Sequence, residues 1–338
     1  MRHELAAVSL VMLLGTGTAH AIDMVIVSGD SLSDGGNVYN VAGNGTAGQF
    51  PWGYPPSPPA MQRFSNGWTA VEVMAAAMGV QLQPSTLGGT NFAYGGATTG
   101  MLNFNAAVGS PPGLPLALLN TGMSSPAQLG QILATPFVAA ETLFVVWGGP
   151  NDLFLAAALS NNDPAVVAQA AANAVMNLAA EVGQLAGAGA QLFLVPNMSN
   201  LGATPYGLTS GDPAALTALS QGFNAGLNAA MAQINQLPGV QVVVFDTYGF
   251  GEMIRANPGA YGFTNVNEPC LANLSALAVN CAGYAFFDGV HPTAAVHALL
   301  GDAFQAALVP EPRTWAMLAA GLLVLAVAAR RRRGYAFG

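Results

Sequence analysis

The sequence predicts an α/β fold in which one parallel sheet is covered by helices on both sides. Short apolar runs, of which 24–27 and 142–147 are the clearest, have the composition of strands buried on both faces. Between these runs lie longer segments whose apolar residues recur every three or four positions, as in amphipathic helices. Because strands and helices alternate along the chain, the usual connection rules favour a single parallel sheet. We expect five strands, near residues 25, 81, 144, 193 and 242.

The helices are predicted from the same spacing. From Pro164 the apolar residues continue at helical spacing for several turns, and Asp163 is a suitable N-cap. The glycine- and proline-rich residues 35–66 predict a surface loop over the end of the first strand, with Trp52 and Tyr54 in one wall of a pocket. Further helices are expected over residues 68–78, 125–134, 216–237 and 294–308.

Both ends of the chain have the features of export signals. Residues 1–21 have a basic start, then an apolar stretch, then small residues up to Ala21, which is the layout of a cleaved signal peptide. Residues 310–338 contain Pro310-Glu311-Pro312, then fifteen apolar residues at 315–329, then four arginines at 330–333. That apolar run is shorter than the ~20 residues that span a bilayer comfortably, although the arginines fit a cytoplasmic stop.

This C-terminal tail resembles the PEP-CTERM sorting tail of Gram-negative bacteria. The resemblance implies transient membrane anchoring, processing by an exosortase-type enzyme, and release to the cell surface or exterior. An ordinary membrane anchor is the alternative, and it would also place the domain outside the cytoplasm. Residues 22–309 would then form one mature domain, since we find neither an internal repeat nor an interdomain linker.

Residues 22–309 contain no lysine, two arginines and fourteen acidic residues, a formal net charge of −12. Nucleic acid is therefore excluded as an expected partner, because phosphate binding needs a basic face. The only cysteines are Cys270 and Cys281, and two nearby cysteines in an exported protein pair more often than they stay free. A metal site would need more ligands than these two, so we expect neither a metal nor a cofactor.

Polar residues follow the ends of predicted strands, where open α/β folds hold their ligands. Ser31 comes shortly after the first strand, and Asn151 follows the strand at 142–147. A serine hydroxyl is a weak nucleophile unless a base accepts its proton and N–H donors stabilise the oxyanion. A reading of Ser31 as a nucleophile therefore requires a base and donors elsewhere in the chain.

Residues 22–309 offer two histidines as the base, His291 and His297. Asp288 lies three residues before His291 on a tight turn, so its carboxylate can accept from Nδ1 while Nε2 faces Ser31. We expect His297 to be a half-buried or surface residue of the last helix. Taken singly, each motif has a plainer interpretation as a turn or a helix cap.

Four segments in this order resemble the sequence blocks of the GDSL, or SGNH, hydrolase family, which includes lipases and esterases. They are Gly29-Asp30-Ser31-Leu32-Ser33-Asp34, Gly89-Thr90-Asn91-Phe92-Ala93, Gly149-Pro150-Asn151-Asp152 and Asp288-Gly289-Val290-His291-Pro292. The segment Arg63-Phe64-Ser65-Asn66-Gly67 also resembles a stretch of the lipase-like branch. The resemblance implies the SGNH-hydrolase fold, a flavodoxin-like three-layer αβα sandwich with a five-stranded parallel sheet.

The resemblance also implies roles for individual residues. Ser31 would be the nucleophile, His291 the base and Asp288 its orienting partner. The oxyanion hole would combine the Ser31 N–H, the Asn151 amide and one glycine N–H, for which we favour Gly96 over Gly95. The remaining acidic residues of the blocks are better interpreted as turn and cap residues than as metal ligands; these are Asp30, Asp34 and Asp152.

The predicted function is that of a secreted serine esterase or lipase that forms an acyl-enzyme. The family resemblance covers acyl chains and acylated sugars as substrates, so the head group and the acyl length stay open. An acyltransferase or a polysaccharide deacetylase with the same site is an alternative. A surface binding protein on a degenerate hydrolase fold is another, against which the intact set of site residues argues.

Overall fold

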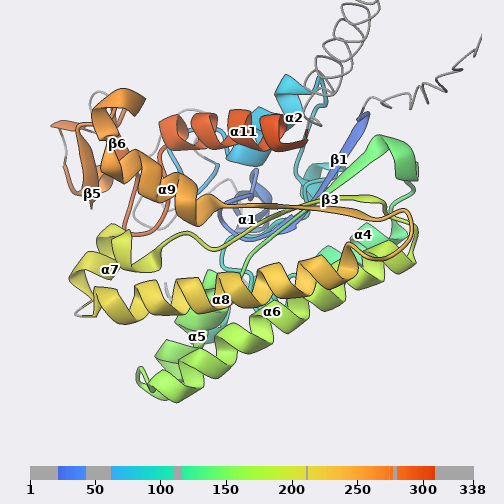
Figure 1. Ribbon diagram of the computed structural model, residues 1–338, viewed down its shortest axis with the longest axis horizontal. Helices are drawn as coiled ribbons and strands as arrows, with labels where there is room; N and C mark the ends of the chain where they lie inside the picture. Colours follow the sequence, from blue (N-terminus) through green and yellow to red (C-terminus); the bar gives the residue numbers. More distant parts are fainter. Residues whose placement is uncertain are drawn as a thin grey trace, which may run out of the picture.

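The computed structural model describes residues 22–42, 62–109, 116–210, 212–273, 275–276 and 280–308. At its centre is a parallel four-stranded sheet with the order β1-β2-β3-β4 (Figure 1). Each of its strands was predicted, and their bounds are Met24–Gly29, Thr142–Trp147, Leu192–Pro196 and Gln241–Phe245. The predicted signal peptide and sorting tail lie outside the described residues, as does the segment with Trp52 and Tyr54.

The predicted strand at 80–82 is wrong, because that segment forms no ladder with the sheet. Residues 90–94 lie beside β1 instead: the Val27 N–H donates to the Thr90 carbonyl at 3.0 Å, and the Phe92 N–H donates to the Val27 carbonyl at 2.8 Å. Only Asn91 forms a bridge with β1, since the chain turns away at Tyr94 to Ala97. Long-range pairing therefore selects a different segment from the one that apolar composition favours.

The predicted helices are present, with ends that differ by a few residues. Asp163 accepts hydrogen bonds from two backbone N–H groups and caps α6, as expected. The predicted helix at 125–134 begins as one π-helical turn, η4 (Pro126–Gly130), and continues as α4. The main helices are α2 (Ala70–Ala77), α3 (Phe104–Val108), α4 (Gln131–Ala134), α5 (Pro150–Ser160), α6 (Pro164–Gly187), α7 (Pro205–Thr209), α8 (Pro213–Ile234), α9 (Thr247–Ala256) and α11 (Ala294–Leu308).

In the described part of the expected loop, residues 35–42 and 62–66, the chain forms the short helix α1 (Asn37–Ala42). The Asp34 carboxylate accepts hydrogen bonds from the backbone N–H groups of Gly36, Asn37 and Val38, so it holds the first turn in place. A side-chain acceptor of this kind satisfies donors that a helix start leaves free. The glycine-rich composition of this segment favoured a loop, so the short helix after Asp34 was not predicted.

The sheet separates two hydrophobic cores. Strand side chains alternate between faces, so Ile26 packs with residues of α6 and α8, whereas Val25 packs with residues of α2 and α11. Figure 1 shows the same layers, with α2 and α11 on one side of the sheet and α5, α6 and α8 on the other. The predicted three-layer αβα class is confirmed. Among the described helices, α6 alone is long and apolar enough to match a membrane span. Its buried face belongs to the hydrophobic core that it forms with Ile26 and α8.

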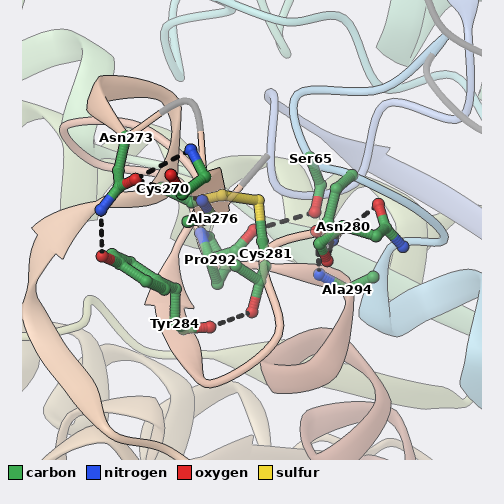
Figure 2. The surroundings of a disulfide bond; sticks show 12 residues. Ser65, Cys270, Asn273, Ala276, Asn280, Cys281, Tyr284, Pro292 and Ala294 are labelled. Atoms are coloured by element: carbon green, nitrogen blue, oxygen red, sulfur yellow. Dashed lines mark hydrogen bonds between the residues drawn. A yellow bond between two sulfur atoms is a disulfide. The ribbon is translucent and has the colours of Figure 1, made fainter. Parts of the chain in front are cut away.

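A second, two-stranded sheet carries the loop that leads to His291. It pairs β5 (Asn265–Pro269) with β6 (Tyr284–Phe286), and the Cys270–Cys281 disulfide closes the connection between them (Figure 2). The Cα atoms of the two cysteines lie 5.5 Å apart, so the predicted pairing is present. Phe287, which follows β6, is fully buried against the disulfide. The disulfide loop therefore adjoins the predicted acid and base.

Candidate active site

Ser31 lies in a tight turn directly after β1. The turn is closed by the N–H groups of Ser33 and Asp34, which donate to the Asp30 carbonyl at 3.1 and 3.0 Å. A side chain at Gly29 would meet the Trp147 carbonyl oxygen at 2.8 Å, so only glycine lets β1 approach β2 so closely here. The geometry presents the Ser31 hydroxyl at the carboxyl edge of the sheet.

The three residues predicted to form a triad lie within hydrogen-bond distance in the expected order. The Ser31 Oγ lies 2.8 Å from the His291 Nε2, and the His291 Nδ1 lies 2.6 Å from the Asp288 Oδ2. The other Asp288 oxygen accepts the backbone N–H groups of Val290 at 2.9 Å and His291 at 2.7 Å. The Asp288 carboxylate is therefore held by the backbone of the turn that also carries His291, whose imidazole it contacts.

The surroundings of His291 favour its protonated form. Burial opposes the charge of the imidazolium, but the charge and hydrogen bond of Asp288, together with the charge of Asp30, outweigh that cost and raise the pKa of His291. A raised pKa strengthens the imidazole as a proton acceptor. The site can therefore take a proton from Ser31 and hold the charge that results.

Gly95 and Gly96, the two glycines considered from the sequence as oxyanion donors, have different surroundings in the structure. The Gly95 N–H donates to the Asp34 carboxylate at 2.9 Å and is therefore already engaged. Gly96 lines the same cavity as Ser31, with a φ of 82°. A Cβ at this position would lie 2.6 Å from the side-chain oxygen of Asn103, so both backbone angle and space require glycine here.

Asn151, the second residue of α5, lines this cavity as well. Its Nδ2 donates to the Ala97 carbonyl at 3.0 Å and makes a longer contact of 3.4 Å with the Asp30 Oδ2. Ser31, Gly96, Asn151 and His291 thus line one cavity, and Asp288 lies behind His291. Every residue predicted for the triad and the oxyanion hole lies at this one place.

The role of Asp30 goes beyond the turn residue that the sequence predicted. Burial raises the pKa of its carboxyl to about 7, against the opposing effects of the Leu32 N–H and the His291 charge. The carboxyl contacts the Asn151 amide at 3.4 Å and interacts with the charge of His291, so it influences two parts of the site. The position of Asp30 directly before Ser31 was the signal that the sequence offered for a role in the site. Its burial depends on distant segments, so the sequence did not reveal it.

The predicted environment of His297 is wrong, because this side chain is buried with 1% exposure. Its Nδ1 accepts the Ala70 N–H, at the start of α2, at 3.1 Å. Burial, and then the charge of His291, lower the pKa of His297 to about 3, so its imidazole is neutral. His297 therefore joins α11 to α2 and is not the base. The sequence showed only its own helix and not the partner helix that covers it.

A cavity of about 540 Å³ opens at Ser31 and has a largely apolar lining. Its lining residues come from α3, α5, α7, α9, β5, β6 and α11, and from the loops beside them. Within the described residues, no three His, Cys, Asp or Glu side chains gather as a metal-binding group. The large apolar side chains that line the cavity include Phe64, Phe104, Trp147, Phe154, Met198, Tyr206, Phe250, Ile254, Phe286 and Leu300.

A family model described as GDSL-like lipase/acylhydrolase matches residues 25–304. The chain belongs to this family. The family resemblance predicted from the sequence blocks is therefore confirmed, and the chain is an ester-hydrolysing serine hydrolase of the α/β class. The match extends from the first strand of the sheet into α11, so it covers both Ser31 and His291.

Named relatives include esterases that match over most of their length. A GDSL esterase/lipase of Arabidopsis thaliana is 26% identical, over 85% of this chain and 89% of its own. Acetylajmalan esterase 2 of Rauvolfia serpentina is 28% identical, over 86% and 92%. Among solved structures, an alpha/beta hydrolase enzyme from the metagenome of Lake Arreo aligns with a TM-score of 0.44, 14% identity and coverage of 86% and 95%.

Proposed function

We propose that Ser31, His291 and Asp288 form the catalytic triad of a carboxylesterase or lipase. The single observation that carries this proposal is the 2.8 Å contact between the Ser31 Oγ and the His291 Nε2 inside the cavity. His291 takes the hydroxyl proton as Ser31 attacks the ester carbonyl, and Asp288 stabilises the imidazolium. His291 then gives the proton to the leaving alcohol. In the second half, His291 takes a proton from a water molecule that attacks the acyl-enzyme carbonyl, and returns it to the Ser31 oxygen as the carboxylic acid leaves.

The proposed oxyanion hole consists of the backbone N–H groups of Ser31 and Gly96 and the side-chain amide of Asn151. One N–H of the Asn151 amide donates to the Ala97 carbonyl at 3.0 Å, and the other makes only the longer 3.4 Å contact with the Asp30 Oδ2, so this second N–H can be shared with a negative oxygen. Asp30 would aim the amide toward that oxygen. Donors of this type act most strongly where water is excluded, as in a cavity with apolar walls.

Asn151→Ala is expected to lower kcat by about 10²–10³-fold, the usual effect of removing one oxyanion donor. The measurement is the steady-state hydrolysis of p-nitrophenyl esters by the full chain. Asn228→Ala, at an exposed asparagine of α8, is the matched control and should keep wild-type kcat. An Asn151→Ala enzyme with unchanged kcat would remove this amide from the oxyanion hole.

The lining of the cavity favours an ester with an apolar acyl chain. Each buried methylene contributes about 0.8 kcal/mol, so kcat/KM should rise up to about fourfold for every methylene that enters the cavity. The test is a series of p-nitrophenyl esters from acetate upward, with the full chain. We expect a rise over several carbons and then a plateau. A maximum at acetate would instead support a deacetylase.

We also propose that the domain acts outside the cytoplasm. The disulfide between Cys270 and Cys281 supports this, because such bonds persist mainly in oxidising compartments. The predicted signal peptide at 1–21 and sorting tail at 310–338, with its exosortase-type partner, belong to this proposal. Mass spectrometry of the mature N-terminus tests the first of them, with cleavage after Ala21 as the expected result.

A further inference from the structure

The segment Ser65-Asn66 contacts the backbone on the far side of His291, although more than two hundred residues separate them in sequence. The Ser65 Oγ donates to the Pro292 carbonyl at 2.9 Å. The Asn66 Oδ1 accepts the Ala294 N–H at 2.7 Å. Both side chains are buried, with exposures of 0% and 8%. The two bonds hold the residues that directly follow the proposed base (Figure 2).

Asn66 also connects this backbone to the disulfide loop. Its Nδ2 donates to the Asn280 carbonyl at 3.0 Å, next to Cys281 (Figure 2). On the other side of the loop, the Leu271 N–H donates to the Phe287 carbonyl at 2.9 Å, directly before Asp288. The turn that carries Asp288 and His291 is therefore held from both ends.

Phe64, the preceding residue, lies beside the site itself. Its ring centroid is 5.4 Å from that of His291. The same ring fills the space beside Gly95, where a Cβ would lie 2.0 Å from its atoms. The segment thus contacts the base on one side and the glycine pair of the oxyanion region on the other.

We propose that Ser65 and Asn66 are positioning residues that set the distance between His291 and Ser31. Asp288 orients the imidazole within its own turn, but Ser31 belongs to a different element, the end of β1. The 2.8 Å contact therefore depends on where the whole 288–292 turn lies. The segment 64–66 ties that turn to the disulfide loop, to the start of α11 and to the wall of the cavity. This proposal rests on the proposed triad.

The expected effect of Asn66→Ala is a loss of about 10²-fold in kcat, because a displacement of about 1 Å at a reacting pair costs this much. KM should stay within about twofold, since Asn66 does not line the cavity. Asn66→Asp keeps an acceptor for the Ala294 N–H but loses the donor to the Asn280 carbonyl, so it should recover part of the loss. Ser65→Ala should lower kcat in the same direction.

The matched control is Asn273→Ala, at a second asparagine of the disulfide loop. Its Nδ2 donates to the Tyr284 hydroxyl at 3.0 Å, and its Oδ1 accepts N–H groups of the loop itself (Figure 2). Within the part of the chain that the structure describes, Asn273 makes no hydrogen bond with residues 292–294, so kcat should equal that of wild type. Comparison of Asn273→Ala with Asn66→Ala therefore distinguishes the loss of a hydrogen bond within the disulfide loop from the loss of the bonds that hold the backbone after His291.

The experiment measures the rate at which a fluorophosphonate labels Ser31 in the full chain, together with kcat and the thermal midpoint. Labelling depends on proton transfer to His291, so its rate per folded molecule should fall with kcat in Asn66→Ala. A lower thermal midpoint with wild-type labelling and kcat would reduce Asn66 to a structural role and overturn the inference. Failure of the wild-type chain to label would overturn the triad itself, which is a separate result.

Discussion

Ser31→Ala is expected to reduce ester hydrolysis by about 10⁶-fold in kcat, the loss seen when the serine of such a triad is removed. Without the hydroxyl no acyl-enzyme forms, and His291 has no proton to accept from this position. The fold should persist, because Ser31 is only half-buried and the Asp30 turn is closed by backbone bonds. The measurements are p-nitrophenyl ester hydrolysis and the far-ultraviolet circular dichroism of the full chain.

Ser33→Ala is the matched control, because it makes the same substitution two residues away in the same turn. The Ser33 Oγ is buried and has no hydrogen-bond partner among the described residues. Removing it leaves no group unsatisfied, so both kcat and stability should stay close to wild type. Retained activity in Ser31→Ala with loss in Ser33→Ala would transfer the nucleophile to Ser33.

Asp288→Asn is expected to lower kcat by about 10⁴-fold at neutral pH, because an amide in place of the carboxylate can favour the wrong imidazole tautomer and cannot stabilise the imidazolium. The acid limb of the pH profile should also move. His291 acts as a base only when neutral, so activity falls as the pH drops through its pKa. Asp288 raises that pKa, and its removal should shift the limb to lower pH.

The profile of kcat/KM against pH, measured for the full chain and for Asp288→Asn, tests the expected direction of this shift of the acid limb. In the wild type the limb should lie above the ordinary histidine value of about 6.5. Asp302→Asn, at an exposed acid of α11, should change neither the limb nor kcat. A limb that stays in place in Asp288→Asn would assign it to another group, of which the nearby Asp30, with a pKa of about 7, is the first to consider.

Local patterns in the sequence were enough for most of the layered architecture. The four regular strands are continuous apolar runs, and the long helices have strong helical spacing, so each element has its own signal. The candidate site residues were also predictable. Ser31 and Asn151 follow strand ends that a parallel sheet brings to one edge, and Asp288 lies three residues before His291 on one turn. Residues 22–309 contain only two histidines, so the sequence left only two candidates for a histidine base.

Features that depend on contacts between distant segments were decided by the tertiary structure. The edge of β1 pairs with residues 90–94 and not with 80–82, because hydrogen bonding to β1 outweighs apolar composition. His297 is buried by α2, which its own helix does not reveal. The distant Asp34 accepts the Gly95 N–H, which favours Gly96 as the glycine of the proposed oxyanion hole.

The sequence alone therefore determined which side chains are proposed to carry the chemistry, since their identity and order are local properties. The tertiary structure decided how those side chains are held. Asp30 contacts the Asn151 amide, and Ser65 and Asn66 hold the backbone that follows His291, through bonds between segments up to 228 residues apart. Burial and hydrogen bonding across such distances arise only when the chain has folded, so no local pattern predicts them.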